Sequence, residues 1–116
     1  MRHSNRVKKF GRERKERKAL MRSLAESLLE RGRIRTTEAR AKALRPFVER
    51  IITLSRSGTF ESRRLVRARL RNTISLGRLY RSVAPKYATV RGGYTRVVKA
   101  GFRISDGAKM AIIELV

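Results

Sequence analysis

The side chains that most often carry out catalysis or bind metal ions are scarce in this sequence. Its 116 residues include one histidine, His3, and nine carboxylates, but no cysteine. His3 lies in a basic segment with too few apolar residues to build a pocket, and most carboxylates alternate with arginines in patterns typical of exposed ion pairs. No spacing typical of a Ser-His-Asp triad or of a metal site is present. We therefore expect no enzymatic activity, no cofactor and no small-molecule substrate.

The basic side chains offer a different chemistry, which is the binding of phosphate. Lys and Arg together number 31 against 9 Asp and Glu, which gives a formal net charge of +22 at pH 7. Arginine contributes 23 of these cations and lysine 8. Planar guanidinium groups bind phosphate through paired hydrogen bonds and can stack on bases, which favours a structured RNA as the partner. A compact, nucleoid-like DNA-binding protein is the alternative with the same charge.

The first 16 residues are predicted to form a basic arm. Nine of the first eighteen residues are Lys or Arg, and few apolar residues lie between them. A segment of this composition does not fold on its own hydrophobicity and needs a polyanion to become ordered. We expect the arm to bind RNA through Arg2, His3, Arg6, Lys8, Lys9, Arg12, Arg14 and Lys15.

Further basic residues lie on the elements predicted behind the arm. Arginine recurs over residues 63–71 on one side of a predicted helix, whose other side carries Leu65, Val66 and Leu70. Like charges at helical spacing repel one another unless an anion lies opposite, although a solvated helix surface is the alternative interpretation. Two more arginines flank Ile34 and project to one side of a short predicted strand. The RNA-binding candidates in these parts are Arg33, Arg35, Lys42, Arg63, Arg64, Arg67 and Arg71.

A loop with two adjacent glycines follows the helical part of the chain. Glycine lets the backbone approach a phosphate closely, and arginines and a tyrosine flank the pair. The lysine, the spacing and the following helix of a nucleotide-binding P-loop are missing. We expect Arg91, Gly92, Gly93, Tyr94 and Arg96 to contact RNA, with a core position for Tyr94 as the alternative.

The helices that must position these residues are predicted from apolar periodicity. Apolar residues at spacings of three and four predict a first helix that ends at Gly32, where a left-handed cap is favoured. A second helix, capped by Thr36 or Thr37, contains Pro46, which predicts a kink or a break. A third helix carries the arginine face, and a short fourth helix is expected to end at Pro85.

After these helices the pattern changes from helical to extended. Residues 94–100 and 110–116 are rich in β-branched and apolar residues, and an Asp-Gly step between them favours a turn. These strands should form an antiparallel hairpin, joined by the strand near Ile34. The predicted fold is α+β, with about four helices packed on a small mixed sheet, and residues 17–116 form a single compact domain. No apolar run is long enough to span a bilayer, so no membrane partner is expected.

Several segments along the chain match, in order, those of one known family. They are residues 1–3 (MRH), 32–37 (GRIRTT), 44–49 (LRPFVE), 63–64 (RR), 84–88 (APKYA), 92–96 (GGYTR) and 113–116 (IELV). In these segments the chain resembles the bacterial large-subunit ribosomal protein seventeen family. Residues 13–17 (ERKER) depart from the family's pattern, which has neutral or basic residues after the Gly-Arg of the arm.

The resemblance implies a structural protein of the large ribosomal subunit that binds 23S-type ribosomal RNA. It further implies that the arm threads between RNA helices while the α+β domain lies nearer the surface. Neighbouring large-subunit ribosomal proteins near the exit of the peptide tunnel are the protein contacts that the resemblance implies. The expected location is the cytoplasmic ribosome, with the ribosome of an organelle as the alternative.

Overall fold

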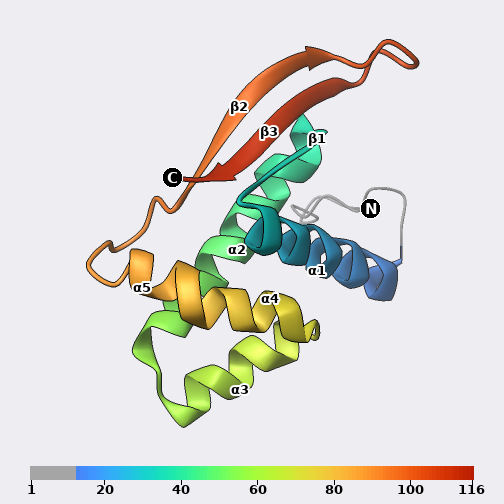
Figure 1. Cartoon of the computed structure of the whole chain (residues 1–116). Coiled ribbons are helices and arrows are strands. Elements are labelled where there is room, and N and C mark those ends of the chain that lie inside the picture. The colour runs from blue at the N-terminus through green and yellow to red at the C-terminus, as the bar shows by residue number, and fades with distance from the viewer. Residues whose placement is uncertain (1–12) are drawn as a thin grey trace, which may run out of the picture.

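Residues 14–86 are mainly helical, apart from one short strand, and the residues after them are mainly extended (Figure 1). The computed structural model describes residues 13–116. Its helices are α1 (Arg14–Arg31), α2 (Glu38–Ser57), α3 (Phe60–Arg69), α4 (Thr73–Arg78), the π-helical turn η1 (Leu79–Val83) and α5 (Ala84–Lys86). Its strands are β1 (Arg33–Thr37), β2 (Thr95–Phe102) and β3 (Lys109–Leu115). The predicted α+β class is confirmed.

Helix boundaries lie where the sequence provides caps. Gly32 ends α1 in the left-handed conformation, with φ of 83°. The hydroxyls of Thr37 and Thr59 each accept a hydrogen bond from the backbone N–H three residues on, at 3.3 and 3.2 Å, and so cap α2 and α3. Because α1 begins at Arg14, residues 14–16 of the predicted arm are part of a helix.

Neither proline ends a helix. Pro46 lies inside α2, which is continuous, so the break that was one of its two predicted effects is absent. Pro85, expected to close the fourth helix, instead lies in α5, which continues directly from η1. The N–H of Ala84 donates to the carbonyl of Leu79 five residues back. This wider turn replaces the regular α turn that the proline ring would crowd, so the helical path passes Pro85 instead of ending there.

The three strands form one sheet in the order β1-β3-β2. The predicted hairpin of β2 and β3 and the pairing of the strand near Ile34 are both confirmed. The sheet is antiparallel throughout, so the prediction of a mixed sheet is wrong in that respect. The hairpin reverses the chain between β2 and β3, and β1 pairs antiparallel with the other edge of β3. Ile34, Val97 and Ile113 are in register with one another and pack against the core.

The core lies between the helices and one face of the sheet. Leu28 of α1, Leu44 and Ile51 of α2 and Ile113 of β3 are fully buried there. The far end of the β2–β3 hairpin extends beyond the helices (Figure 1). The helices cover only one face of the sheet, and the arginines that alternate with the buried residues of β1 therefore lie on its open face.

Candidate nucleic-acid interface

The arginines of α3 and of the residues after it extend into solvent without counter-charges. Arg63, Arg64, Arg67 and Arg71 are exposed, and none of them forms an ion pair within residues 13–116. The Arg63 guanidinium carbon lies 5.4 Å from the centre of the Tyr80 ring, a contact that orients the cation without neutralising it. Repulsion between these like charges is unfavourable in the free protein. The surface is therefore suited to binding phosphates.

The opposite side of α3 fixes the direction of these arginines. Ser62, Val66 and Leu70, spaced by four residues, are buried and hold the helix against the rest of the domain. Leu65 was predicted to share this side, but it is 51% exposed. Each residue rotates by about 100° around a helix, so the residue before Val66 falls outside a stripe that repeats every four residues.

Two candidate arginines lie on the edge strand β1, on the open face of the sheet. Arg33 and Arg35 are exposed and form no ion pair within residues 13–116. Arg33 lies opposite Glu114 of β3, and Arg96 of β2 lies opposite the same residue from the other side. The Nη2 and Nε groups of Arg96 donate to Oε1 of Glu114 at 2.7 and 2.9 Å. Part of the Arg96 charge is thus offset, whereas Arg33 and Arg35 remain available to phosphate.

Tyr94 belongs to the core, which corrects the prediction that it contacts RNA. Its side chain is 1% exposed, and its ring centre lies 5.2 Å from that of Tyr87. Its hydroxyl accepts a hydrogen bond from Nη1 of Arg56 at 2.9 Å and lies 3.1 Å from Oγ1 of Thr53. A ring enclosed in this way has no face left on which a base could stack. The core position, given as the alternative, is the observed one.

The two glycines before Tyr94 shape the loop that leads into β2. Gly92 and Gly93 have φ angles of 142° and 65°, a region that residues with side chains rarely adopt. Arg91 is exposed beside them. The loop thus presents one cation and an open backbone, and its contact with RNA remains a prediction.

The other candidates are divided between α1, α2 and the start of the chain. Arg14 and Lys15 are exposed in the first turn of α1. Lys42 of α2 lies with its Nζ 2.8 Å from Oε1 of Glu38, and this hydrogen bond lowers the pKa of Glu38. The charge of Lys42 is therefore partly offset in the free protein. The remaining candidates of the arm lie outside the described residues: Arg2, His3, Arg6, Lys8, Lys9 and Arg12.

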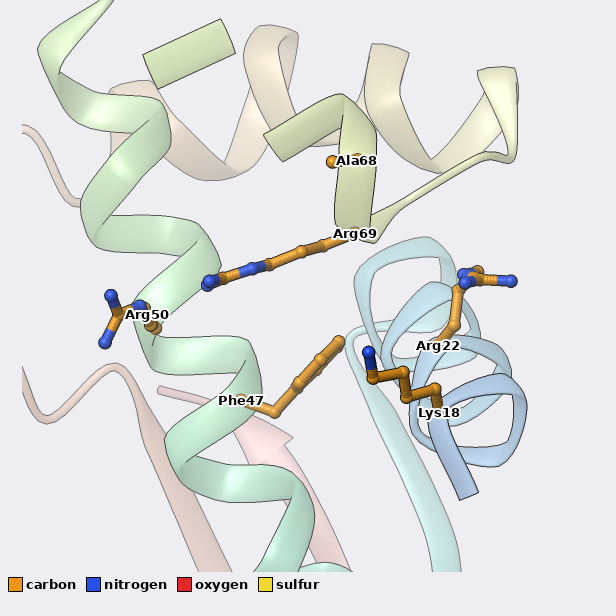
Figure 2. A pocket seen from close by; sticks show the side chains of 6 residues that line it. All are labelled: Lys18, Arg22, Phe47, Arg50, Ala68 and Arg69. Atoms are coloured by element: carbon orange, nitrogen blue, oxygen red, sulfur yellow. The ribbon is translucent and has the colours of Figure 1, made fainter. Parts of the chain in front are cut away.

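A cleft of about 650 Å³ between α1, α2 and α3 brings together basic residues that the sequence analysis did not place side by side (Figure 2). It is lined by Lys18, Arg22, Phe47, Arg50, Ala68 and Arg69. Figure 2 shows Lys18 reaching from α1 towards the Phe47 ring, and Arg69 extending from α3 across the hollow towards α2. The spacing of four between Lys18 and Arg22 places both on one side of α1. Only the folded chain shows that α2 and α3 face that side.

Within residues 13–116, no group of His, Asp and Glu side chains is arranged to hold a metal ion. No helix in the same range is long and apolar enough to cross a membrane.

The chain is similar to a family of known proteins along nearly its whole length. Residues 20–116 match the family model described as ribosomal protein L17. Over 116 residues the chain is 47% identical to the large ribosomal subunit protein bL17 of Gemmatimonas aurantiaca, a match that covers 100% of this chain and 98% of that protein. The bL17 protein of Methylacidiphilum infernorum is 47% identical over 98% of this chain and 87% of its own length. The bL17 protein of Akkermansia muciniphila is 47% identical over 100% of this chain and 85% of its own length.

Proposed function

The chain belongs to the ribosomal protein L17 family, and from that premise we propose that it is a structural constituent of the large ribosomal subunit that binds and stabilises 23S-type ribosomal RNA. Membership of the family makes it a structural ribosomal protein and not an enzyme. The contacts that we propose are made to phosphates and to the shape of the RNA, since A-form helices expose little base sequence to side chains.

The observation that carries this proposal is the set of arginines on α3 that no acid balances. The chain has a net charge of +22, and Arg63, Arg64 and Arg67 project from one helix face. Phosphates opposite these groups remove their mutual repulsion and release condensed counterions, which supplies much of the binding free energy. Arg33 and Arg35 extend the same chemistry to the open face of the sheet.

We further propose that the basic arm, predicted over residues 1–16, becomes ordered between RNA helices over the part that precedes α1 when the protein binds. Its Lys and Arg side chains neutralise phosphates where RNA helices crowd together. The arm and the α3 face then act as two parts of one phosphate-binding surface. The cytoplasmic ribosome is the location that accords with this role, and an organellar ribosome is the alternative.

Neighbouring large-subunit proteins near the exit of the peptide tunnel are the proposed protein partners. The far end of the β2–β3 hairpin supports a protein contact, because Phe102 and Ile104 are 68% and 103% exposed there. Large apolar side chains at a projecting tip are costly in water and are covered when a partner packs on them. The exposed apolar residues of this tip support a protein partner, and the arginines without ion pairs support RNA as a partner.

A nucleoid-like protein that coats duplex DNA is the second candidate function, and the high net charge is the observation that favours it. Competition separates the two. A ribosomal protein should keep its bound ribosomal RNA in the presence of excess duplex DNA, whereas a nucleoid protein should transfer to the DNA. Transfer of most of the protein to DNA at physiological salt would favour the nucleoid function.

Sedimentation of native cell extract through a sucrose gradient tests the proposal directly. We expect the chain to migrate with the large ribosomal subunit and with intact ribosomes, and to leave that position when the RNA is digested. Migration with free proteins of low mass, at low salt, would contradict the proposed function.

A further inference from the structure

We propose that the cleft between α1, α2 and α3 binds one unstacked nucleotide of RNA, with its base against Phe47 and its phosphate between Lys18 and Arg69. This inference rests on the proposed function and deepens it, because it names the RNA element that one site takes. The arginine surface of α3 needs only phosphates, whereas this cleft combines cations with an aromatic wall (Figure 2).

The first argument concerns Arg22, which lacks an acidic partner. Within residues 13–116 its Nε atom is buried and makes no hydrogen bond. The acid at helical spacing from it is Glu26, one turn further along α1. Oε2 of Glu26 instead accepts the backbone N–H groups of Arg71 and Asn72, at 3.2 and 2.9 Å. The carboxylate is thus engaged at the start of α4, and the positive charge at the rim of the cleft stays uncompensated.

The other three cations of the cleft are also without acids. Lys18, Arg50 and Arg69 have no Asp or Glu three or four residues away on their helices, and none forms an ion pair within residues 13–116. Arg69 lies in the last turn of α3, where the helix dipole favours a cation but supplies no anion. In Figure 2 the ends of Lys18 and Arg69 lie in the hollow, whereas those of Arg22 and Arg50 point away from it, so an anion between Lys18 and Arg69 lowers the repulsion of those two cations.

The second argument concerns Phe47, which gives the cleft an apolar surface. Phe47 is partly buried and packs against the core, so its ring is held in place from behind. The ends of the Lys18 and Arg69 side chains lie on either side of it (Figure 2). A ring fixed between two cations suits a nucleotide, because bases stack on aromatic rings with little dependence on sequence while the phosphate meets the cations.

The size of the cleft limits the part of an RNA that can enter. Its volume of about 650 Å³ lies inside the range of roughly 300–1,000 Å³ typical of small-ligand sites. A base inside a duplex is stacked on both faces and cannot reach Phe47, so the occupant is an unpaired nucleotide from a bulge, a loop or an end. An acidic peptide would use the cations but leave the aromatic wall unused, which makes it the less complete fit.

The experiment uses the full chain and two RNA probes of equal charge at 0.3 M salt, where phosphate contacts alone are weakened. One probe is a single-stranded RNA with a central 2-aminopurine, and the other is a hairpin RNA of the same length that carries the same fluorophore within its base-paired stem. We expect Phe47→Leu to weaken single-strand binding about tenfold and to leave duplex binding unchanged. Binding to the wild-type chain should quench the 2-aminopurine fluorescence of the single strand, and binding to Phe47→Leu should not. Phe47→Tyr keeps an aromatic ring, so its affinity for the single strand and its fluorescence quenching should equal those of the wild-type chain.

Charge variants separate this cleft from general attraction. Lys18→Gln and Arg69→Gln should each weaken single-strand binding more than Arg78→Gln, an equal loss of charge at an exposed site outside the cleft. The comparison of the cleft and control charge variants still tests the proposal if Phe47→Leu unfolds, which a thermal melt reveals.

Three results would overturn the proposal. They are equal effects of Phe47→Leu on both probes, equal effects of the cleft and control charge variants, and displacement of the probe by oligoglutamate that is as strong for Phe47→Leu as for the wild-type chain. The last result would indicate an acidic protein as occupant. None of them bears on migration with the large subunit, so the proposed function is tested separately.

Discussion

Tyr94 and Tyr80 are tyrosines with buried hydroxyls that differ in their partners. The Tyr94 hydroxyl accepts a hydrogen bond from Arg56 at 2.9 Å and lies beside Thr53. The Tyr80 hydroxyl has no hydrogen-bond partner within residues 13–116. Burial raises the pKa of Tyr80, against the opposing effect of the positive charges of Arg63 and Arg67. A satisfied hydroxyl in the core indicates a structural role for Tyr94.

The first prediction compares these two tyrosines. Tyr94→Phe should lower the free energy of unfolding by about 1–2 kcal/mol, because Nη1 of Arg56 loses its acceptor while Nη2 keeps the Ala88 carbonyl. Tyr80→Phe should leave that free energy unchanged or raise it slightly, since the hydroxyl that it removes makes no hydrogen bond in the described part of the chain. Urea denaturation measures both values. A loss of RNA affinity in Tyr94→Phe without a change in stability would instead place Tyr94 in the RNA interface.

A second prediction at this scale concerns the ion pair in the hairpin loop. The hydrogen bond from Arg103 to Asp106, followed by that from the Ala108 N–H, lowers the pKa of Asp106 from 3.8 to about 2. Because the folded-state pKa lies below the unfolded value, the pair stabilises the loop fully above pH 3.8, and this stabilisation is lost as the pH falls towards 2. Carboxyl-carbon NMR should show a midpoint near 2. In Arg103→Gln the midpoint should rise, and a wild-type midpoint near 4 would contradict the pairing.

At the scale of elements, the sequence predicted features that neighbouring residues determine better than features that depend on packing. Gly32 and Thr37 act on the backbone within a few residues of themselves, so their caps can be identified without the rest of the fold. Leu65 and Pro85 depend on what lies against their helices. Leu65 is exposed, and the helical path widens before Pro85 instead of ending there. Both results depend on how the helices pack, which local sequence patterns do not show.

The start of α4 yields a prediction about a single cap. Oδ1 of Asn72 accepts the backbone N–H groups of Ile74 and Ser75 at 2.8 and 3.2 Å. Asn72→Ala should therefore lower the free energy of unfolding by about 1 kcal/mol. Thr73→Ala, a change at the next, exposed position, should stay within about 0.5 kcal/mol of the wild-type chain. Equal midpoints for the two variants in urea would show that the cap contributes nothing.

At the scale of the whole molecule, part of the candidate interface was predictable and part was not. Charge and helical period mark the arginines of α3 as phosphate ligands in the sequence itself. The pairing of Arg96 with Glu114 depends on strand register, which sequence patterns fix only loosely. The cleft beside Phe47 requires three helices to pack together, so its cations are distant in the chain and adjacent only in the fold.

The salt dependence of RNA binding measures how many cations take part. If about ten phosphates are neutralised, the logarithm of affinity should fall with the logarithm of salt at a slope of about −7 to −9. The triple variant Arg63→Gln, Arg64→Gln, Arg67→Gln should make the slope shallower by about 2 to 3. Loss of three exposed cations elsewhere, in Arg78→Gln, Lys99→Gln, Lys109→Gln, should leave the slope unchanged. A wild-type slope near −2 would contradict phosphate contact as the main source of affinity.

Removal of residues 1–12 tests whether the arm and the domain are separable. A chain that starts at Glu13 keeps the first turn of α1, because the Arg17 N–H donates to the Glu13 carbonyl at 2.8 Å. The deletion removes five Lys and Arg residues, so the salt slope should become shallower by about 3.5 to 4.5. The urea midpoint should not change, since a segment as rich in Lys and Arg and as poor in apolar residues as residues 1–12 adds little to a core. If the truncated chain instead binds RNA weakly because it has unfolded, the arm stabilises the domain. The arm and the domain would then not be separable parts of the chain.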